Sequence, residues 1–246
     1  MAHQVASSLL SPFLTRPCSS LEILGSSSSL IWLAIDDRAL TIQRSTPDSQ
    51  IALPTSIFLA GAKPLTALEI SLRDGLLAID DSPLQISRWW RPPRALLHHS
   101  ATTFTPAPKI EGLLGLGRGL TPEGDDLLAG WLVAARSIGH PEFEEVRAQI
   151  LSNASINTTT FSATLLEYAA QGYGIAPLID YVNACLQGSN KASAIRMRLE
   201  GVGHTSGEAL AIGVEIALGS LSHGIDFGKY PFYKEQPPNG PSTYRS

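Results

Sequence analysis

Residues 115–126 have the sequence Gly-Leu-Gly-Arg-Gly-Leu-Thr-Pro-Glu-Gly-Asp-Asp, and an apolar stretch over residues 127–135 follows directly. Three glycines at alternate positions permit backbone angles that other residues resist, and they let the main chain approach another group closely. Thr121 followed by Pro122 is typical of a helix start, with threonine as the N-cap and proline where no N–H group is needed. Because the helix that follows is apolar on every side, the stretch predicts a buried core helix that begins at a glycine-rich loop.

The same loop is the predicted functional centre of the protein. Glu123, Asp125 and Asp126 place carboxylates in the first turns, where they suit the helix dipole. A buried helix that begins at a glycine loop presents free N–H groups, and anions bind at such places. The alternative is that the threonine and the acids only cap a core helix. The pattern departs from a P-loop and from a dinucleotide fingerprint. We expect a small anionic ligand here, bound by Gly117, Arg118, Gly119, Thr121, Glu123 and Gly124.

A second glycine-rich segment, Gly-Val-Gly-His-Thr-Ser-Gly over residues 201–207, opens the last predicted helix. Gly124 is followed six residues later by Gly130, and Gly207 is followed six residues later by Gly213. Since small residues permit close helix contact, we expect these two helices to pack together with their N-terminal ends converging on one pocket. The alternative is a coincidence between two glycine-rich helix starts. The residues expected to line the pocket from this side are Thr205, Ser206 and Gly207.

His204 is the best single candidate for proton transfer or for polarising a carbonyl group, because histidine titrates near neutral pH. A lone histidine can equally be a hydrogen-bonded structural group. Asp125 and Asp126 allow a Mg²⁺ site as an alternative. Adjacent positions on a helix point about 100° apart, so the pair cannot chelate one ion without help from elsewhere. We therefore expect no metal ligands and no cofactor.

The first hundred residues predict strands. Residues 30–35 lead into Asp36-Asp37 and a second alternating run, as in a hairpin. Residues 68–72 alternate with period two, and Asp74-Gly75 supplies a hairpin turn. The apolar residues 51–53 and 57–59 flank Pro54, which indicates an edge strand or a break in a strand.

From about residue 106 the pattern changes to helices, expected over residues 127–138, 160–171, 175–186, 192–199 and 208–221. The sequence therefore predicts an α+β fold in which an N-terminal antiparallel β barrel or sandwich precedes a C-terminal α-helical domain. The expected divisions are a mainly β domain at 1–105, a helical domain with the glycine-rich ligand loop at 106–227, and a proline-rich tail at 228–246.

Composition excludes several classes of partner. Lysine plus arginine number 18 against 22 aspartate plus glutamate, a net charge of −4 without a basic cluster, which argues against nucleic acid. No apolar run approaches the roughly 20 residues that a membrane span needs. Cys18 and Cys185 lie far apart with no ligand-like spacing, so a disulfide framework or zinc site is not expected and a reduced, cytoplasmic setting fits best.

Residues 115–126 resemble the hallmark of the DUF2877 family, Gly-Leu-Gly-Pro-Gly-Leu-Thr-Pro-Ser-Gly-Asp-Asp followed by an apolar helix. The chain departs from it at Arg118, where the family has proline, and at Glu123, where it has serine. Arg118 would favour an anionic ligand, whereas Glu123 would oppose one if it faced the pocket. The threonine-rich helix start with Ser162 and the segment 203–207 are also similar to family features, so the resemblance covers about residues 110–215.

This family includes a subunit of the oxamate carbamoyltransferase of anaerobic allantoin breakdown. The resemblance implies a role in carbamoyl transfer between carbamoyl phosphate and oxamate, together with partner subunits. On that chemistry, helix-start N–H groups and Arg118 would hold phosphate or carboxylate. Thr121, His204 or Thr205 would hydrogen-bond the carbamoyl carbonyl.

On the same chemistry, Asp125 or Asp126 would orient donors or take a proton. Whether the chain is itself an enzyme stays open at this point. One alternative is a non-catalytic module that senses a small carboxylate or scaffolds partner subunits. The other is a metal-assisted hydrolase that uses the aspartate pair.

Overall fold

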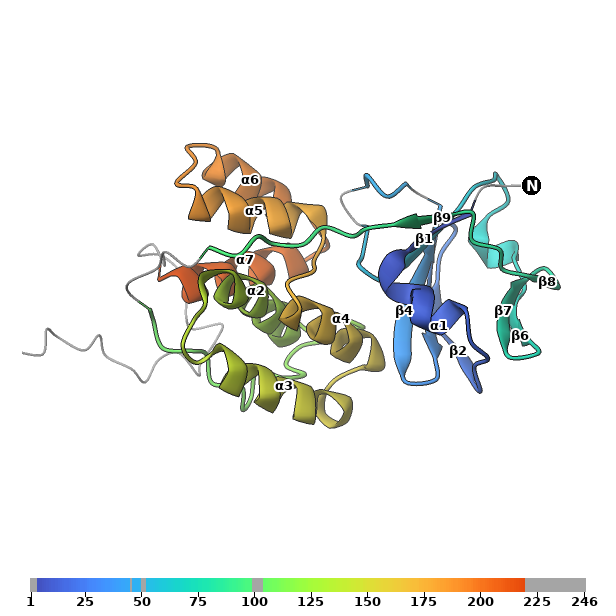
Figure 1. Ribbon diagram of the computed structural model, residues 1–246, viewed down its shortest axis with the longest axis horizontal. Helices are drawn as coiled ribbons and strands as arrows, with labels where there is room; N and C mark the ends of the chain where they lie inside the picture. Colours follow the sequence, from blue (N-terminus) through green and yellow to red (C-terminus); the bar gives the residue numbers. More distant parts are fainter. Residues whose placement is uncertain (1–3, 45, 50–51, 99–103, 220–246) are drawn as a thin grey trace, which may run out of the picture.

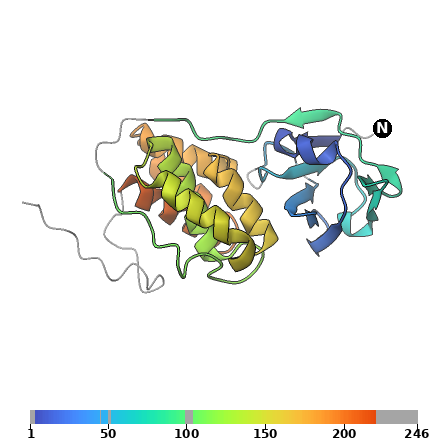
Figure 2. The ribbon, with the colours of Figure 1, turned by 60° about the horizontal axis from the view of Figure 1, so that its bottom comes forward.

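The computed structural model describes residues 4–44, 46–49, 52–98 and 104–219. A sheet-rich N-terminal region and a C-terminal helical domain lie beside one another, and an extended segment after the last strand runs from the first onto the second (Figures 1 and 2). The predicted α+β class is confirmed. The proline-rich tail predicted at 228–246 lies outside the described residues.

The strands form two sheets. Their bounds are β1 Gln4–Ser7, β2 Leu21–Ser26, β3 Leu30–Ile35, β4 Arg38–Gln43, β5 Ser56–Leu59, β6 Ile70–Arg73, β7 Leu76–Ile79, β8 Ser82–Pro83 and β9 Arg88–Trp90. One sheet is six-stranded, in the order β2-β3-β4-β5-β1-β9, and the other is three-stranded, in the order β6-β7-β8. Most pairings are antiparallel, while β4·β5 and β1·β9 are parallel. Short helices at Ser8–Leu10, Ser11–Leu14 (α1) and Leu65–Ala67 connect them.

Both predicted hairpins are present, and the two sheets share one apolar core. Asp36 turns between β3 and β4 with φ +53°, and its carboxylate accepts hydrogen bonds from the backbone N–H groups of Ser19 and Ser20. The Asp74-Gly75 turn joins β6 to β7. Leu33 and Ile42 of the larger sheet and Leu77 of the smaller one lie in the same buried cluster. The alternation of apolar residues therefore predicted these strands and the face of each that is buried.

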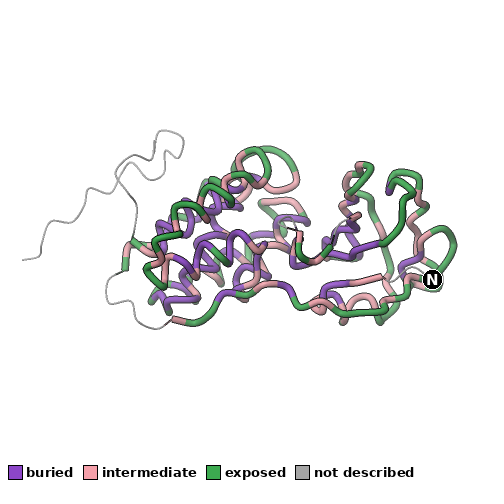
Figure 3. Tube along the Cα trace, turned by 90° about the horizontal axis from the view of Figure 1, so that it is seen from above, coloured by how far each residue is buried: buried purple, intermediate pink, exposed green. Residues whose placement is uncertain are grey.

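The helical domain is built around one buried helix. Its helices are α2 Glu123–Ile138, α3 Phe143–Asn157, α4 Thr160–Ala170, α5 Ala176–Leu186, α6 Ala192–Glu200 and α7 Ser206–Leu218. Trp131, Leu132 and Val133 of α2 are 0% exposed, which confirms the prediction of a core helix. Buried segments run through the middle of this domain (Figure 3). None of the helices in the described part is long and apolar enough to cross a membrane.

Two details complete the comparison with the sequence predictions. Helix α3 was not predicted, since few of its residues are apolar and buried; those that are buried are Phe143, Val146, Ile150 and Ala154. Residues 52–53 form no strand, since Pro54 and Thr55 turn the chain before β5 begins, and Ile51 lies outside the described residues.

The packing of α2 against α7 confirms the predicted close contact between the two glycine-containing helices. A β-carbon on Gly130 would lie 2.1 Å from the carbonyl oxygen of Leu210, and one on Gly213 would lie 2.0 Å from that of Leu127. No larger residue fits at either position without moving the backbone of the neighbouring helix. The two helices therefore touch backbone to backbone.

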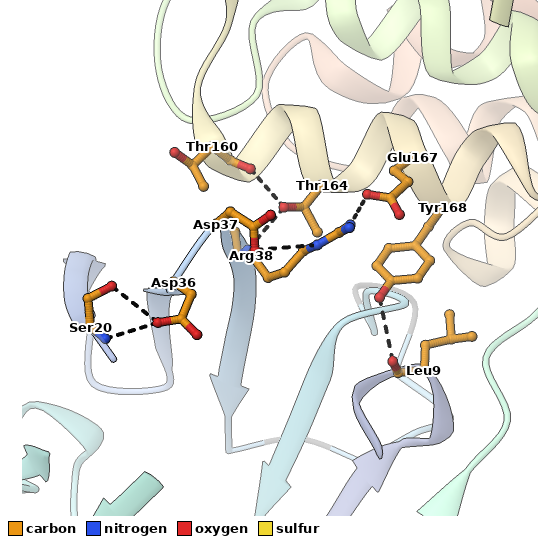
Figure 4. A network of polar contacts seen from close by, with 10 residues as sticks. Leu9, Ser20, Asp36, Asp37, Arg38, Thr160, Thr164, Glu167 and Tyr168 are labelled. Atoms are coloured by element: carbon orange, nitrogen blue, oxygen red, sulfur yellow. Dashed lines mark hydrogen bonds and ion pairs between the residues drawn. The ribbon is translucent and has the colours of Figure 1, made fainter. Parts of the chain in front are cut away.

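The sheet region is docked on α4 through polar contacts (Figure 4). The backbone N–H of Ala39 donates to Thr164 Oγ1 at 3.0 Å in a buried position. Arg38 forms an ion pair with Glu167, and Tyr168 Oη lies 3.5 Å from the carbonyl oxygen of Leu9. These contacts fix the N-terminal end of β4 and the Leu9 segment against α4.

Candidate functional site

The start of α2 differs from the predicted cap. Pro122, with ψ 143°, occupies the N-cap position, and no side chain caps the helix. Thr121 precedes the cap, because the proline already has the extended ψ that an N-cap requires. The N–H of Gly124 donates to the carbonyl oxygen of Leu116 at 2.8 Å, and those of Asp125 and Asp126 donate to that of Pro122. The expectation that these amides are free to hold an anion was therefore wrong.

The glycines of the loop serve close backbone packing at two positions. A β-carbon on Gly115 would lie 2.0 Å from the carbonyl oxygen of Asn157, and one on Gly124 would lie 2.0 Å from that of Leu113. The loop is thus pressed between the end of α3 and the segment before α2. This packing explains the glycines without a ligand.

The Asp125 carboxylate links three segments of the chain through hydrogen bonds. It is 1% exposed, and its Oδ1 accepts from the N–H of Gly115 at 2.7 Å. Its Oδ2 accepts from Ser162 Oγ at 2.7 Å and from the Thr158 hydroxyl. The carboxylate therefore joins the glycine loop, the α3–α4 junction and the first turn of α4. The hydroxyls of this threonine-rich helix start therefore hold the Asp125 carboxylate.

Asp126 faces a different environment. It is 8% exposed, and among the described residues its Oδ2 is buried without a hydrogen-bond partner. Burial raises the pKa of this carboxyl to about 7, repulsion from Asp125 and Glu123 adds to the rise, and the Ser206 hydroxyl works against it. A buried polar atom without a hydrogen-bond partner destabilises the folded state. Asp126 is therefore a candidate for a functional rather than a stabilising role.

Asp126 lines a cavity of about 260 Å³ between the helical domain and the sheet region. Thr121 and Ser206 lie beside it at the same end, with their hydroxyl oxygens 3.5 Å apart. Gly203 of the second glycine-rich segment also lines the cavity. The two helix starts therefore converge on one pocket, as the sequence predicted. The polar groups at its end are side chains rather than backbone amides.

The other predicted site residues lie outside this cavity. Gly117, Arg118, Gly119 and His204 are exposed. Glu123 and Thr205 are half-buried and are not among the cavity-lining residues. Gly207 packs against α6, since a β-carbon there would lie 1.9 Å from the carbonyl oxygen of Leu199. Of the predicted set, the structure thus brings together Thr121, Asp126 and Ser206.

Within the described residues, no group of three or more histidine, cysteine, aspartate or glutamate side chains is arranged to hold a metal ion. Asp125 already has donors on both carboxylate oxygens. The metal-assisted hydrolase alternative therefore finds no ligand set in the described part of the chain.

Comparison with known families identifies a relative of the helical domain. Residues 113–218 match the family model of the oxamate carbamoyltransferase subunit AllH. The helical domain is therefore similar to the AllH family over these residues. The match begins just before the glycine loop and ends at the last residue of α7, so it contains the whole polar end of the cavity. It confirms the resemblance read from residues 115–126. No solved structure matches the chain.

The remaining wall of the cavity lies outside the AllH match. Leu30 and Trp32 of β3, with Leu53 and Pro54 before β5, line it from the sheet region. Sequence reasoning missed these residues, because alternation along a strand shows which side chains share a face but not what that face opposes. Only Trp32, a large aromatic side chain in an otherwise aliphatic strand, offered a signal.

Proposed function

We propose that this chain is a subunit of an oxamate carbamoyltransferase-type enzyme of the cytoplasm and that Asp126 binds the carbamoyl group of the substrate. The AllH match over residues 113–218 supports the relation to that enzyme. The observation that carries the assignment of the site is Asp126 Oδ2, a buried atom without a partner at the end of a cavity.

The chemistry of a carbamoyl group suits the three side chains at this end. Its NH₂ donates hydrogen bonds, which the Asp126 carboxylate can accept, and its carbonyl oxygen accepts them from the hydroxyls of Thr121 and Ser206. Hydroxyls placed at that oxygen stabilise the negative charge that develops when the carbonyl carbon is attacked. The motif predicted an anion-binding helix start, and this arrangement replaces the amides with side chains.

Asp126 can also serve as the proton donor. In phosphate-dependent cleavage of oxalurate, a phosphate oxygen attacks the carbamoyl carbon, the bond from that carbon to the oxamate nitrogen breaks, and the leaving nitrogen takes a proton. A carboxyl group with a pKa of about 7 holds a proton in a large fraction of molecules near neutral pH and can supply it. Asp125 acts as a positioning residue, since its bonds fix the loop and the first turn of α4.

The anionic groups of the substrates need a cation from elsewhere. Among the described residues, those that line the cavity include no lysine, arginine or histidine. Arg118, exposed and three residues before Thr121, is the candidate within this chain. A partner subunit is the other source, in agreement with the multi-subunit enzyme that the family name implies.

The test is phosphate-dependent cleavage of oxalurate by the purified chain, alone and with candidate partner subunits. Asp126→Asn should lower the rate by at least 100-fold while the circular dichroism spectrum is unchanged. The matched control is Asp180→Asn on the exposed face of α5, which should retain full activity. Full activity of Asp126→Asn would refute the proposed role.

A second candidate function is a non-catalytic binding subunit, which the absence of a lining cation in the described cavity also favours. It predicts that Asp126→Asn abolishes ligand binding by this chain but leaves the turnover of the assembled complex unchanged. Calorimetric titration of the isolated chain, run beside the activity assay, separates the two functions.

A further inference from the structure

Two arginines meet beside the loop between α4 and α5. Arg94 is exposed and lies in the segment after β9, which is fixed to this loop because the N–H of Ala95 donates to the carbonyl oxygen of Gly172 at 2.9 Å. Arg136 is half-buried and lies in the last turn of α2. A β-carbon on Gly172 would lie 3.2 Å from Arg136 Nη1 and 3.6 Å from Arg94 Cγ, so the two side chains pass over the same glycine.

Neither guanidinium forms an ion pair within the part of the chain that the structure describes. Arg94 Nε donates to the carbonyl oxygen of Gln171 at 2.9 Å, and its two terminal nitrogens have no described partner. Arg136 makes no hydrogen bond with a described residue. Glu144, whose charge acts on Arg136, is already paired with Arg147 at 3.2 Å. The two arginines therefore present uncompensated positive charge and several N–H donors without acceptors.

The close approach of these two charges is unfavourable in itself. Burial lowers the pKa of Arg136, and the neighbouring charge of Arg94 lowers it further. An anion placed between the two guanidinium groups would remove the repulsion and accept their hydrogen bonds.

The end of α2 does not account for Arg136. A cation in the last turn of a helix can bind the final carbonyl groups. In α2 the carbonyl oxygen of Arg136 already accepts from the N–H of Gly139, and that of Ala135 accepts from the N–H of His140. The helix dipole attracts the guanidinium group but gives its N–H groups no acceptor.

Arg94 is held in position in the absence of a ligand. Its Cζ lies 5.1 Å from the centroid of the Tyr173 ring, and its Nε is bound to the loop. Stacking on an aromatic ring orients the planar guanidinium, so little freedom is lost when a ligand binds. The donors left for a ligand are those on the two terminal nitrogens.

The arginine pair is separate from the carbamoyl site. Arg136 follows Asp126 by ten residues in one helix, which corresponds to about 15 Å along the axis. Neither arginine is among the residues that line the cavity, although Tyr173, on which Arg94 stacks, does line it. An anion at the pair is therefore too far from Asp126 to take part in the proposed transfer.

The number of donors selects the kind of anion. A carboxylate has one charge and two oxygens, which a single arginine fork satisfies, whereas a phosphate dianion has enough charge and oxygens for two forks. We infer that Arg94 and Arg136 bind a phosphate dianion, either free or as the terminal group of a phosphate monoester, at a site outside the cavity. This site goes beyond the proposed carbamoyl transfer and does not depend on it.

Three probes test the ligand class. The full chain is titrated by calorimetry at pH 8, where phosphate is mainly a dianion, with inorganic phosphate, glycerol 3-phosphate and acetate. Saturable binding of either phosphate compound, at least tenfold tighter than that of acetate, is expected. The tighter of the two identifies the free ion or the monoester as the ligand. Binding of acetate as tight as that of both phosphate compounds, or no saturable binding of either, would overturn the inference.

Three further variants locate the bound phosphate. Arg94→Gln and Arg136→Gln should each weaken its binding by at least tenfold, because each removes one fork. Arg198→Gln, at an exposed position of α6, is the matched control and should leave the affinity unchanged. If the affinity falls only in Arg118→Gln, the phosphate lies at the glycine loop and the inference is wrong.

Thermal denaturation separates ligand binding from a structural role of Arg136. Without phosphate, Arg136→Gln should melt at the same temperature as the wild type or higher, because the variant lacks the repulsion from Arg94. Phosphate should raise the melting temperature of the wild type and not that of the variant. A variant that melts lower without phosphate, and is stabilised by phosphate as much as the wild type, would show that Arg136 is structural and would refute the site.

Discussion

Asp125 and Asp126 are neighbours in the first turn of α2 and are both buried, yet Asp125 has donors on both carboxylate oxygens and Asp126 has none on Oδ2. Because adjacent helical positions point about 100° apart, one carboxylate faces the glycine loop and α4 while the other faces the cavity. The pair in the motif thus has two different tasks. Asp125 holds the loop and α4 together, and Asp126 is the residue that we propose binds the ligand.

The structural task of Asp125 predicts a large loss of stability when its carboxylate is removed. Asp125→Ala leaves the N–H of Gly115 and the hydroxyls of Thr158 and Ser162 without their acceptor, so the free energy of unfolding should fall by roughly 3 kcal/mol or more. Urea denaturation measures this. Ser162→Ala, which removes a single donor, should cost about 1 kcal/mol. Equal losses in both variants would contradict the shared-acceptor role.

Removing the charge of Asp126 should instead stabilise the protein, and the size of this effect depends on pH. Its pKa is raised from 3.8 to about 7, so between these values the native state holds a proton that the unfolded state has released. The free energy of unfolding of the wild type therefore falls as pH rises through this range, and Asp126→Asn lacks that term. Relative to wild type, the variant should gain roughly 2–3 kcal/mol of stability between pH 5 and pH 8. A pH-independent difference in urea denaturation would show that the carboxyl titrates normally.

Sequence reasoning succeeded where local chemistry decides structure. The apolar run after Asp126 predicted a buried helix, and the Asp74-Gly75 turn predicted a hairpin, because both follow from periodicity and turn preference. The equal spacing of Gly124 to Gly130 and Gly207 to Gly213 predicted the α2–α7 contact.

Sequence reasoning failed where the role of a residue depends on a contact with a distant part of the chain. The hydroxyls of Thr158 and Ser162 donate to the Asp125 carboxylate. The N–H of Gly124 donates to the carbonyl oxygen of Leu116. Neither set of hydrogen bonds has a local signal in the sequence. The wall formed by Trp32 could not be foreseen, because it depends on how β3 is placed against the helical domain.

The α2–α7 contact predicts that the site depends on glycine at the helix crossing. Gly130→Ala and Gly213→Ala each place a β-carbon about 2 Å from a carbonyl oxygen of the other helix. Each should lower the free energy of unfolding by roughly 1–3 kcal/mol, because overpacking forces the backbones apart. The same shift separates Thr121 from Ser206 and should lower the rate of oxalurate cleavage by the folded variants.

A matched glycine provides the control for this pair. Gly201, at the end of α6, has a negative φ of −71° and its nearest neighbour would lie 3.5 Å from an added β-carbon. Gly201→Ala should therefore leave stability unchanged within about 0.5 kcal/mol and should retain the rate of oxalurate cleavage. Thermal denaturation and the oxalurate-cleavage assay of the three variants test the comparison.

The docking of the sheet region on α4 predicts a further effect on binding. Thr164→Val keeps the shape of the side chain but leaves the buried N–H of Ala39 without an acceptor, at a cost of about 1–3 kcal/mol. We expect weaker ligand binding as well, since one wall of the cavity belongs to the sheet region. Calorimetry and urea denaturation measure the two effects. Loss of stability with unchanged affinity would show that the wall stays in place without this bond.

The cavity is lined by two parts of the chain, of which one matches the AllH family model and the other does not. Its polar end lies within residues 113–218, where the AllH pattern is found, whereas Leu30, Trp32, Leu53 and Pro54 come from a region that the pattern does not cover. Under the proposed function, the helical domain holds the carbamoyl group and the sheet region supplies another wall of the cavity. Substitution of Leu30 or Trp32 would then change the apolar wall of the cavity without altering Asp126.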